Sequence, residues 1–563
     1  MAIPSSAIGE IHTGGSDTTN GGWFDPGQTV GMAADGAATV ATTASPVFTS
    51  ASYTFVAGDV GAYLYISPTA NWIAGWYKIA SVAGGAATLS AAAGAAELKT
   101  GGLTTVAGCA IVASPTGATW AIDYSQQDAA QFTYTDLHGV GASFDLTSAA
   151  KPFTVAMVGN FLRVTGGTGF AAGIYYITTV VAGTATFGPG QPHTGAGDNA
   201  DGTGGMGGAF ATPGMAGSEL LAGNKLWLKY NATAVTATST TSNVASGRFT
   251  GPTGTVTAPV VFQGYETVRG DQTANRPTFQ WAANGGTNYL VTLAAFNTVS
   301  NIIFDGVTAS FTGRGISLSG GGHRVYRAKV MRFRDIPFQS GNGSIVIEDS
   351  EFTGNAAAAG TISLATLVNH EFTGLYVHDN SGPGITISTG RVHVSQCIFD
   401  TNTGAGISST GASEVGVSNC TFYANTGAGI DFTAQPNRGE IINCAFEANG
   451  DHGIKMAAAY SSIRTINCAF FNNTTAKYTG ITTVLPYGHL NGYNVVGEIV
   501  ATASMFTNAA GADFSPNGTA GGGILIKGTG YPQTFPGLAT PANKMDVGAY
   551  SLGVGGFPPI IGN

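Results

Sequence analysis

The 563-residue chain has few charged side chains, since Asp, Glu, Lys and Arg together make up only 9% of it. Acidic residues outnumber basic ones, and the formal net charge is −9 at pH 7. A negative balance opposes binding to nucleic acid or to an anionic membrane surface. No apolar run approaches the roughly 18 residues that a membrane span needs. We therefore expect neither nucleic-acid binding nor a membrane span.

Cysteine and targeting signals are also scarce. Five cysteines are too few to form a disulfide scaffold for a chain of this length. The first residues, Met1–Ser6, lack the charged and apolar segments of a secretory signal, so we expect no signal peptide. The chain has no P-loop, His-Glu-x-x-His, Gly-x-Ser-x-Gly or paired Cys-x-x-Cys motif. We accordingly expect no metal and no cofactor.

Glycine and apolar residues are abundant instead, with 85 glycines and an apolar share of 43%. This composition excludes a disordered chain. High Gly, Ala, Thr and Ser with few Lys, Glu and Arg favours turns and strands over helices, and so predicts an all-β protein.

The second half carries a repeat in which Cys-x-Phe is followed by asparagine three residues after the phenylalanine. Four cysteines recur every 23 or 24 residues, and earlier coils fit with substitutions, so the period is 22–25 residues. A period in this range indicates coils that stack and bury their apolar faces on one another. We predict inward ladders of buried free thiols, aromatic rings and side-chain amides. Their members are Cys397, Cys420, Cys444 and Cys468; Phe399, Phe422, Phe446 and Phe470; and Asn355, Asn380, Asn402, Asn425, Asn449 and Asn473.

A different repeat occupies the first half. Residues 55–89 match residues 153–187 at a constant offset of 98, with alternating apolar residues and Gly turns that predict a small β module present twice. The expected organisation runs from the N-terminus to the C-terminus. It has an arm (1–50), the first module (51–100), a connecting β segment (101–150), the second module (151–194), a Gly-rich linker (195–223), a parallel β-helix (224–500) and a cap (501–563).

The coils resemble the right-handed parallel β-helix superfamily, which includes pectin-degrading enzymes and phage tailspikes. Val260–Tyr265 with Arg269-Gly-Asp271 is similar to the first coils of such domains, and Met545–Tyr550 is similar to their Asp-x-Gly-Ala-Tyr ending. Three N-terminal segments, Asp123–Asp128, Gly167–Tyr175 and Gly207–Gly214, resemble a recurring assembly in phage and environmental β-helix proteins. The resemblance implies a right-handed parallel β-helix preceded by two small β modules. It does not specify an activity.

The register also predicts one exposed column. If Cys and Phe point inward, the residue after Phe points outward in every coil. The column contains Thr353, His378, Asp400, Tyr423, Glu447 and Phe471, with Asp379 beside it. Asp400 and Glu447 lie two coils apart, roughly 9–10 Å by the strand spacing. That separation is near the upper end for an inverting glycosidase pair.

Asp400 and Glu447 are therefore the catalytic candidates, and His378, Asp379 and Tyr423 are the candidates for substrate binding. A plain solvated face explains the same column. The known pectate-lyase-like enzymes use clustered Asp with Arg or Lys, whereas the regular coils hold four basic residues, none of them in the column: Arg391, Arg438, Lys455 and Arg464. This pattern argues against a polyuronate lyase.

The resemblance favours a structural surface protein of a phage-like virion, such as a tailspike, fibre or decoration protein. Other virion proteins are its expected partners through the N-terminal half, and a host-surface glycan through the β-helix. It implies a homo-oligomer, for which a trimer is the analogy, and a location on the virion after assembly in the host cytoplasm. Two alternatives remain: a polysaccharide depolymerase on the same scaffold, and a bacterial adhesin or extracellular matrix protein.

Overall fold

The structure is a computed structural model, and it describes most of the chain. The described residues are 4–27, 32–39, 47–67, 75–89, 117–141, 144–188, 191–193, 201–238, 247–266, 269–271, 273, 275–307, 312–411, 413–432, 438–456, 463–479, 494–529 and 546–548. The chain divides into two units, Met1–Thr278 and Phe279–Asn563. Strands dominate the described parts of both, and the one α-helix among them is α1 (Pro213–Glu219), so the all-β prediction is confirmed.

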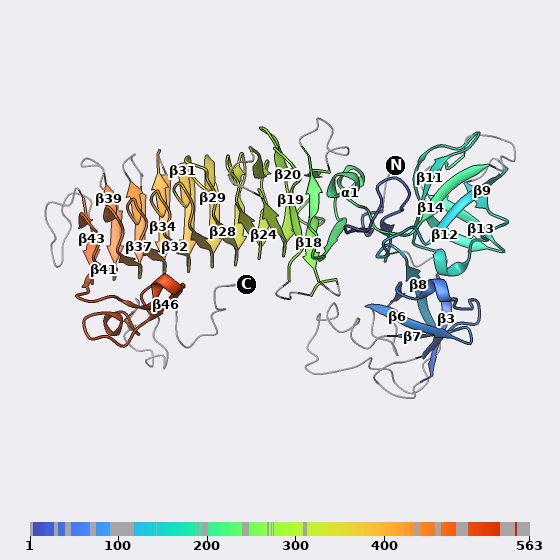
Figure 1. Ribbon diagram of the computed structural model, residues 1–563, viewed down its shortest axis with the longest axis horizontal. Coiled ribbons are helices and arrows are strands. Elements are labelled where there is room, and N and C mark those ends of the chain that lie inside the picture. The colour runs from blue at the N-terminus through green and yellow to red at the C-terminus, as the bar shows by residue number, and fades with distance from the viewer. Residues whose placement is uncertain are drawn as a thin grey trace. The chain divides into compact units, whose positions relative to one another are not determined.

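The first unit contains two closed antiparallel barrels (Figure 1). The first consists of β3 (Ala33–Thr39), β4 (Val47–Thr49), β7 (Ala86–Leu89), β6 (Gly75–Ala83), β5 (Tyr63–Ile66) and β8 (Ala118–Asp123). The second consists of β10 (Asp145–Thr147), β13 (Thr184–Gly188), β12 (Gly173–Val181), β11 (Phe161–Gly166), β14 (Gly202–Met206) and β9 (Phe132–Val140).

The 98-residue repeat is a repeat of structure. β6 and β12 begin 98 residues apart, as do β7 and β13, and as do the short helices η1 (Ala57–Asp59) and η2 (Val155–Met157). Equivalent inward positions are fully buried in both copies, for example Ile79 and Ile177. Burial of alternate residues is what packs a strand against the inside of a small barrel. Each barrel also recruits strands from outside the repeated segment, including β3, β4 and β8 in the first copy.

The predicted Gly-rich linker over 195–223 needs correction. Residues 201–223 include the barrel strand β14, which pairs with β11 and β9, and the helix α1. A Cβ on Gly205 would lie 2.1 Å from the backbone oxygen of Thr19. The glycines therefore allow close approach of neighbouring backbone, which a linker does not require. The earlier part of the predicted linker, 194–200, lies outside the described residues.

The predicted N-terminal arm (1–50) contributes its first strand to a parallel sheet of the first unit and its strands β3 and β4 to the first barrel. β1 (Ile8–Ile11) pairs in parallel with β15 (Lys225–Lys229), and β15 pairs in parallel with β18 (Val260–Tyr265). Parallel pairing of the coil type therefore starts at β15, close to the expected start of the β-helix at 224.

A buried ion cluster ties this sheet to the first barrel. The guanidinium of Arg269 lies 2.8 Å from the Glu10 carboxylate and 2.7 Å from that of Asp123, and all three side chains are almost completely buried. The hydroxyl of Tyr265 donates a hydrogen bond to Glu10. Buried charges of this kind are tolerated only when they are paired and hydrogen-bonded. Arg269 in the Arg-Gly-Asp segment is thus a structural residue of the first unit.

The second unit is a parallel β-helix (Figure 1). Its strand pairings give the coils three faces. The first face contains β20 (Tyr289–Leu293), β23 (Arg314–Leu318), β26 (Phe338–Ser340), β33 (Ile407–Ser409), β36 (Ile430–Phe432), β39 (His452–Met456) and β42 (Ala476–Tyr478). The second contains β21 (Asn297–Ser300), β24 (His323–Tyr326), β27 (Ile345–Glu348), β34 (Ser413–Ser418), β37 (Arg438–Ile442), β40 (Ile463–Ile466) and β43 (Asn494–Val496). The long strands β29 (Ile362–Thr373) and β31 (Ile385–Ser395) contribute to both.

The third face consists of short strands that pair in register from coil to coil. They are β22 (Ile303–Asp305), β25 (Lys329–Met331), β28 (Glu351–Thr353), β30 (Tyr376–His378), β32 (Ile398–Asp400), β35 (Thr421–Tyr423), β38 (Ala445–Glu447), β41 (Ala469–Phe471) and β44 (Ile499–Val500). The parallel pairing of these strands confirms the β-helix and its repeat of 22 to 25 residues.

The inward ladders are present in this unit. Neighbouring rings from Phe399 to Phe470 stack with centroids 4.9–5.0 Å apart. The four repeat cysteines are buried and free. Each ladder amide from Asn355 to Asn449 donates to the side-chain oxygen of the asparagine in the next coil at 2.8–3.0 Å. These bonds satisfy polar groups that would otherwise be buried without partners at the turn.

A second amide ladder lies at the turn that precedes the third face. Asn419, Asn443 and Asn467 have φ of 52–53°, and each stands directly before a repeat cysteine. Asn443 donates to Asn419 at 3.2 Å, and Asn467 donates to Asn443 at 3.0 Å. Asparagine tolerates the left-handed conformation better than other residues with a side chain. The residue before the cysteine therefore forms one corner of the coil.

His370 makes the β-helix sensitive to acid. It is 1% exposed inside β29, its ring nitrogens have no partner, and burial lowers its pKa to about 4. The folded state thus resists protonation, so stability is full above the ordinary pKa of 6.5 and falls as the pH drops from there towards 4. We expect a loss of about 3 kcal/mol by pH 4. His370→Leu should abolish this part of the loss in denaturant titrations at pH 7.5 and pH 4.

The exposed His393 on β31 provides the matched control, because its side chain does not lose solvent on folding to the same degree. His393→Leu should leave the acid-dependent loss unchanged. Equal pH dependence in His370→Leu and the unmodified protein would contradict the assignment.

Candidate functional site

The third face presents two columns of outward side chains. Each short strand places its middle residue inward, so the residues before and after it point out. Strand pairing aligns the column after the middle residue as predicted, with Thr353, His378, Asp400, Tyr423, Glu447 and Phe471 in successive coils.

The column before the middle residue is the part of the site that sequence reasoning missed. It holds Lys329, Glu351, Tyr376, Ile398, Thr421, Ala445 and Ala469. The same alternation that gives the first column also gives this one, because every strand of three residues has two outward positions. The residue between Cys and Phe in each Cys-x-Phe repeat could therefore have predicted this second column.

This second column changes character along the β-helix. Its first members are long and polar, whereas Ala445 and Ala469 are small and completely buried. The small side chains leave room for the segment 501–529, which packs on them through Met505, Phe506 and other apolar residues. Figure 1 shows this segment, with β46 (Asp513–Pro516), beside the coils. Among the described residues, the third face is thus divided into a part that this segment covers and a part that it leaves open.

The C-terminal segment buries Glu447 and forms hydrogen bonds with its carboxylate. Its Oε1 accepts from the hydroxyl of Ser504 at 2.6 Å, and its Oε2 accepts from the backbone N–H of Met505 at 2.8 Å. Glu447 is 4% exposed and Asp400 is 6% exposed, so the expectation that both carboxylates are exposed is wrong. Burial raises the pKa of Glu447, although both hydrogen bonds oppose this. Glu447 anchors the segment.

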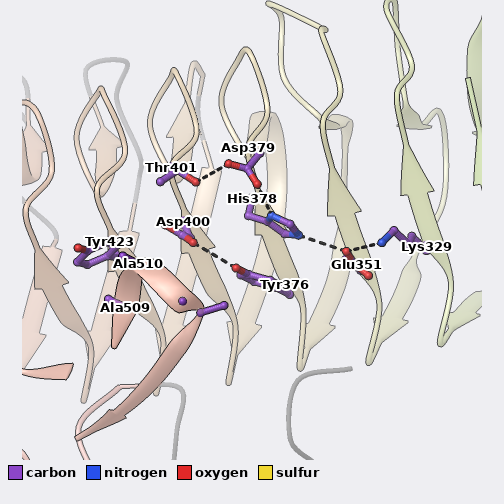
Figure 2. A pocket seen from close by; sticks show the side chains of 12 residues that line it. Lys329, Glu351, Tyr376, His378, Asp379, Asp400, Thr401, Tyr423, Ala509 and Ala510 are labelled. Carbon is purple, nitrogen blue, oxygen red and sulfur yellow. Dashed lines mark hydrogen bonds and ion pairs between the residues drawn. The ribbon is translucent and has the colours of Figure 1, made fainter. Parts of the chain in front are cut away.

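The other four candidates meet at a pocket of about 430 Å³ where the open part borders the covered part. Figure 2 shows its lining, which comes from the third face, the adjoining turns and the C-terminal segment. The lining residues are Lys329, Glu351, Tyr376, His378, Asp379, Asp400, Thr401, Tyr423 and residues 509–512. His378, Asp379, Asp400 and Tyr423 are thus brought together, whereas Glu447 does not line the pocket.

One side of the pocket is a chain of ion pairs. Glu351 Oε1 lies 2.8 Å from Lys329 Nζ and 3.2 Å from His378 Nε2. His378 Nδ1 lies 2.8 Å from the carboxylate of Asp379, whose other oxygen accepts from the hydroxyl of Thr401 at 2.9 Å. Figure 2 shows these contacts as a continuous row. The row fixes the imidazole and leaves Asp379, 63% exposed, at the rim.

Protonation in this row follows from the pairing. Burial lowers the pKa of His378, but its hydrogen bonds with Glu351 and Asp379 outweigh burial, so the net pKa is raised. Burial raises the pKa of Glu351, and its bonds with His378 and Lys329 reverse the sign, so the net pKa is lowered. The pairs therefore favour a charged imidazole and an ionised Glu351.

Asp400 has one carboxyl oxygen that forms no hydrogen bond within the protein. The Tyr376 hydroxyl donates to its Oδ2 at 3.2 Å, while its Oδ1 is buried without a hydrogen-bond partner. Burial raises its pKa to about 6, against the opposing hydrogen bond from Tyr376. The ring of Tyr376 stacks on His378 with centroids 3.9 Å apart. A carboxyl group that titrates near pH 6 beside a pocket can accept or donate a proton under mild conditions.

The role of Glu447 as an anchor is testable. Glu447→Ala removes both acceptors of the segment, and each hydrogen bond to a charged group contributes about 1.5–3 kcal/mol. We expect the Met505 amide to exchange its hydrogen about 100-fold faster, since local opening governs that rate. Glu440→Ala removes a half-exposed carboxylate on the second face and is the control. Unchanged exchange at Met505 in Glu447→Ala would refute the anchoring role.

Comparison with known proteins agrees with the architecture. Residues 295–494 match the family model for the right-handed β-helix region. This region is a right-handed β-helix. No curated protein matches the chain.

Several solved structures match parts of the chain at low identity. A pectate lyase, Pel9A, is 13% identical over 61% of this chain and 91% of that chain, with a TM-score of 0.40. ORF18 of Geobacillus virus E2 is 11% identical over 50% of this chain and 55% of that chain, with a TM-score of 0.36. An alginate lyase from Paenibacillus sp. str. FPU-7 is 12% identical over 52% of this chain and 97% of that chain, with a TM-score of 0.34.

The described residues include no helix that is both long and apolar enough to cross a membrane. Nor do they bring three His, Cys, Asp or Glu side chains into an arrangement that could hold a metal ion.

Proposed function

We propose that the protein is a surface protein of a phage-like virion whose β-helix binds a glycan in the pocket on its third face. The observation that carries the glycan site is the pocket itself, in which the Tyr376 ring and the Asp400 carboxyl lie side by side. Binding sites for small ligands combine apolar or aromatic walls with a few fixed polar groups. A pyranose ring offers an apolar face and several hydroxyl groups, which suits this combination.

The virion part of the proposal is supported by the organisation of the chain. The N-terminal half contains the duplicated barrels and the segments that resemble phage β-helix proteins, and it would attach the protein to other virion proteins. The β-helix would project from the particle, because stacked coils with paired backbone form a rigid scaffold. Assembly as a homo-oligomer belongs to the same proposal. Immunogold labelling should find the protein on purified particles, and a protein absent from particles would overturn this part.

A second candidate function is a polysaccharide depolymerase, and the state of Asp400 favours it. With a pKa of about 6 and a free Oδ1, Asp400 could protonate the oxygen of a glycosidic bond as a general acid. Its partner would be Glu351 or Asp379, which line the same pocket. Glu447 is a poor partner, since both of its oxygens are engaged by the C-terminal segment.

Filling the pocket from its far wall tests the glycan site. Ala510 lines the pocket from the C-terminal segment and is exposed. Ala510→Trp should fill the pocket without altering the third face, and we expect at least about tenfold weaker glycan binding on an array of host-surface glycans. The matched control is Thr507→Trp, an exposed position of the same segment outside the pocket. Equal binding by both variants would place the glycan site elsewhere.

A further inference from the structure

The cations of the pocket are already neutralised by the protein. Among the described lining residues, the basic side chains are Lys329 and His378. Lys329 is held by Glu351, and His378 is held between Glu351 and Asp379. With Asp400, the lining has three carboxyl groups against one lysine and one histidine. A ligand carboxylate or sulfate would find no uncommitted cation among these residues and would face like charge.

The pocket has an excess of hydrogen-bond acceptors instead. Asp400 Oδ1 and Glu351 Oε2 are both buried without a hydrogen-bond partner. An ionised carboxylate can only accept hydrogen bonds, and a ligand hydroxyl can supply the missing donor once these side chains turn their buried oxygens towards the pocket. A buried acceptor without a partner costs free energy, which a ligand hydroxyl would recover on binding. The site is therefore built for a ligand that donates.

The aromatic side chains restrict the ligand further. Tyr376 lies flat on His378, with an interplanar angle of 17°, and Tyr423 lines the same pocket. Flat rings of this kind pack against the apolar C–H face of a pyranose. The aromatic rings and the carboxylate acceptors together favour a ligand ring that has an apolar face and several hydroxyl donors and no acidic substituent.

Resting on the proposed glycan-binding function, we propose that the pocket selects an uncharged polysaccharide of hydroxyl-bearing hexoses and rejects uronate or sulfated chains. Rejection arises from the carboxylates Glu351, Asp379 and Asp400, since like-charge contacts in a binding site cost several kcal/mol. Selection arises from the free Asp400 and Glu351 oxygens, which acidic substituents cannot satisfy. Specificity of this kind combines an attractive and a repulsive element.

The experiment compares matched ligands on the full-length protein by isothermal titration calorimetry. One ligand is hexagalacturonate, and the other is the same oligosaccharide after reduction of its carboxyl groups to alcohols. Neutral hexaoses of glucose and mannose extend the panel. We expect the neutral form to bind at least about tenfold more tightly than the uronate. In Glu351→Gln, which frees Lys329 and leaves His378 paired with Asp379 alone, the preference should shrink by about tenfold or more.

The outcomes separate the two proposals. Tighter binding of the uronate than of its reduced form overturns the charge selectivity and leaves glycan binding in place. Absence of binding to every oligosaccharide and to the host glycan array overturns the proposed function and, with it, the selectivity. Should Glu351→Gln fold poorly, Asp379→Asn replaces it, because Asp379 is exposed at the rim and its substitution removes one of the two carboxylates that hold His378. An unchanged preference in a folded variant overturns the repulsive role of the carboxylates.

Discussion

Replacing Asn425 with alanine is expected to lower the free energy of unfolding of the β-helix by about 4 kcal/mol. Asn425 is completely buried. Its amide donates to the backbone oxygen of Phe399 and to Asn449, both at 3.0 Å, and its oxygen accepts from the backbone and the side chain of Asn402. Alanine removes all four bonds, each of which contributes about 0.5–1.5 kcal/mol. The Asn402 amide keeps its bond to Val377 and Asn449 keeps the backbone N–H of residue 425, but the backbone N–H of Asn402 loses its acceptor.

Denaturant unfolding followed by circular dichroism measures the effect, and the neighbouring Thr426 supplies the control. The side chain of Thr426 is exposed, and its backbone N–H keeps its bond to the Asn402 carbonyl at 2.8 Å in any variant. Thr426→Ala should change stability by less than about 0.5 kcal/mol. If Asn425→Ala unfolds at the same denaturant concentration as Thr426→Ala, the ladder does not stabilise the coils.

Replacing Asp400 with asparagine is expected to stabilise the β-helix at neutral pH. The folded-state pKa of about 6 lies above the ordinary 3.8, so the folded state favours the protonated acid. The associated cost is absent below pH 3.8, grows as the pH rises towards 6, and reaches about 3 kcal/mol above that. Asparagine stays neutral, so Asp400→Asn should raise the unfolding temperature at pH 7.5 and leave it nearly unchanged at pH 4.

The same substitution should weaken glycan recognition by about 10–100-fold, the loss expected for one hydrogen bond to a charged acceptor. If the protein is a depolymerase, cleavage should be lost as well, because an amide cannot serve as the general acid. Asp379→Asn is the control for stability, since Asp379 is 63% exposed. Lower stability at pH 7.5 in Asp400→Asn would show that the Asp400 carboxylate stabilises the coils. It would contradict the assignment of this carboxylate as an unpaired acceptor for a ligand.

The coil itself is predictable from the sequence because its determinants are local and periodic. Alternation within Cys-x-Phe settles which side chains face inward, and the spacing of the asparagines settles which coils align. The same logic places Asp400 above Tyr423 on the third face, and could have placed Tyr376 there too. Residues that repeat are therefore the residues whose positions the sequence determines.

Burial of the column depends on contacts between distant parts of the chain, and periodicity does not reveal these. Glu447 is covered because Met505, 58 residues later, returns to it. In the sequence of the coils, this contact is marked only by two small residues, Ala445 and Ala469, on which the segment packs. Small residues at outward positions look neutral in a sequence until the partner that covers them is known.

The barrels show a similar limit. The 98-residue match identifies the duplicated core, but the barrels are closed by strands that do not repeat. β14 escaped prediction because a strand of sequence Gly-Thr-Gly-Gly-Met has the composition of a linker. Its glycines are present because neighbouring backbone passes within contact distance, as at Thr19.

The most direct measurement of the central claim is an experimental structure of the full-length protein with the oligosaccharide that binds most tightly. We expect sugar density in the pocket, with one hydroxyl within hydrogen-bond distance of Asp400 Oδ1 and the ring against Tyr376 or Tyr423. The C-terminal residues 509–512 should form the opposite wall. Sugar density on the first or second face, or on the barrels, with an empty pocket would contradict the assignment of the third face as the binding site.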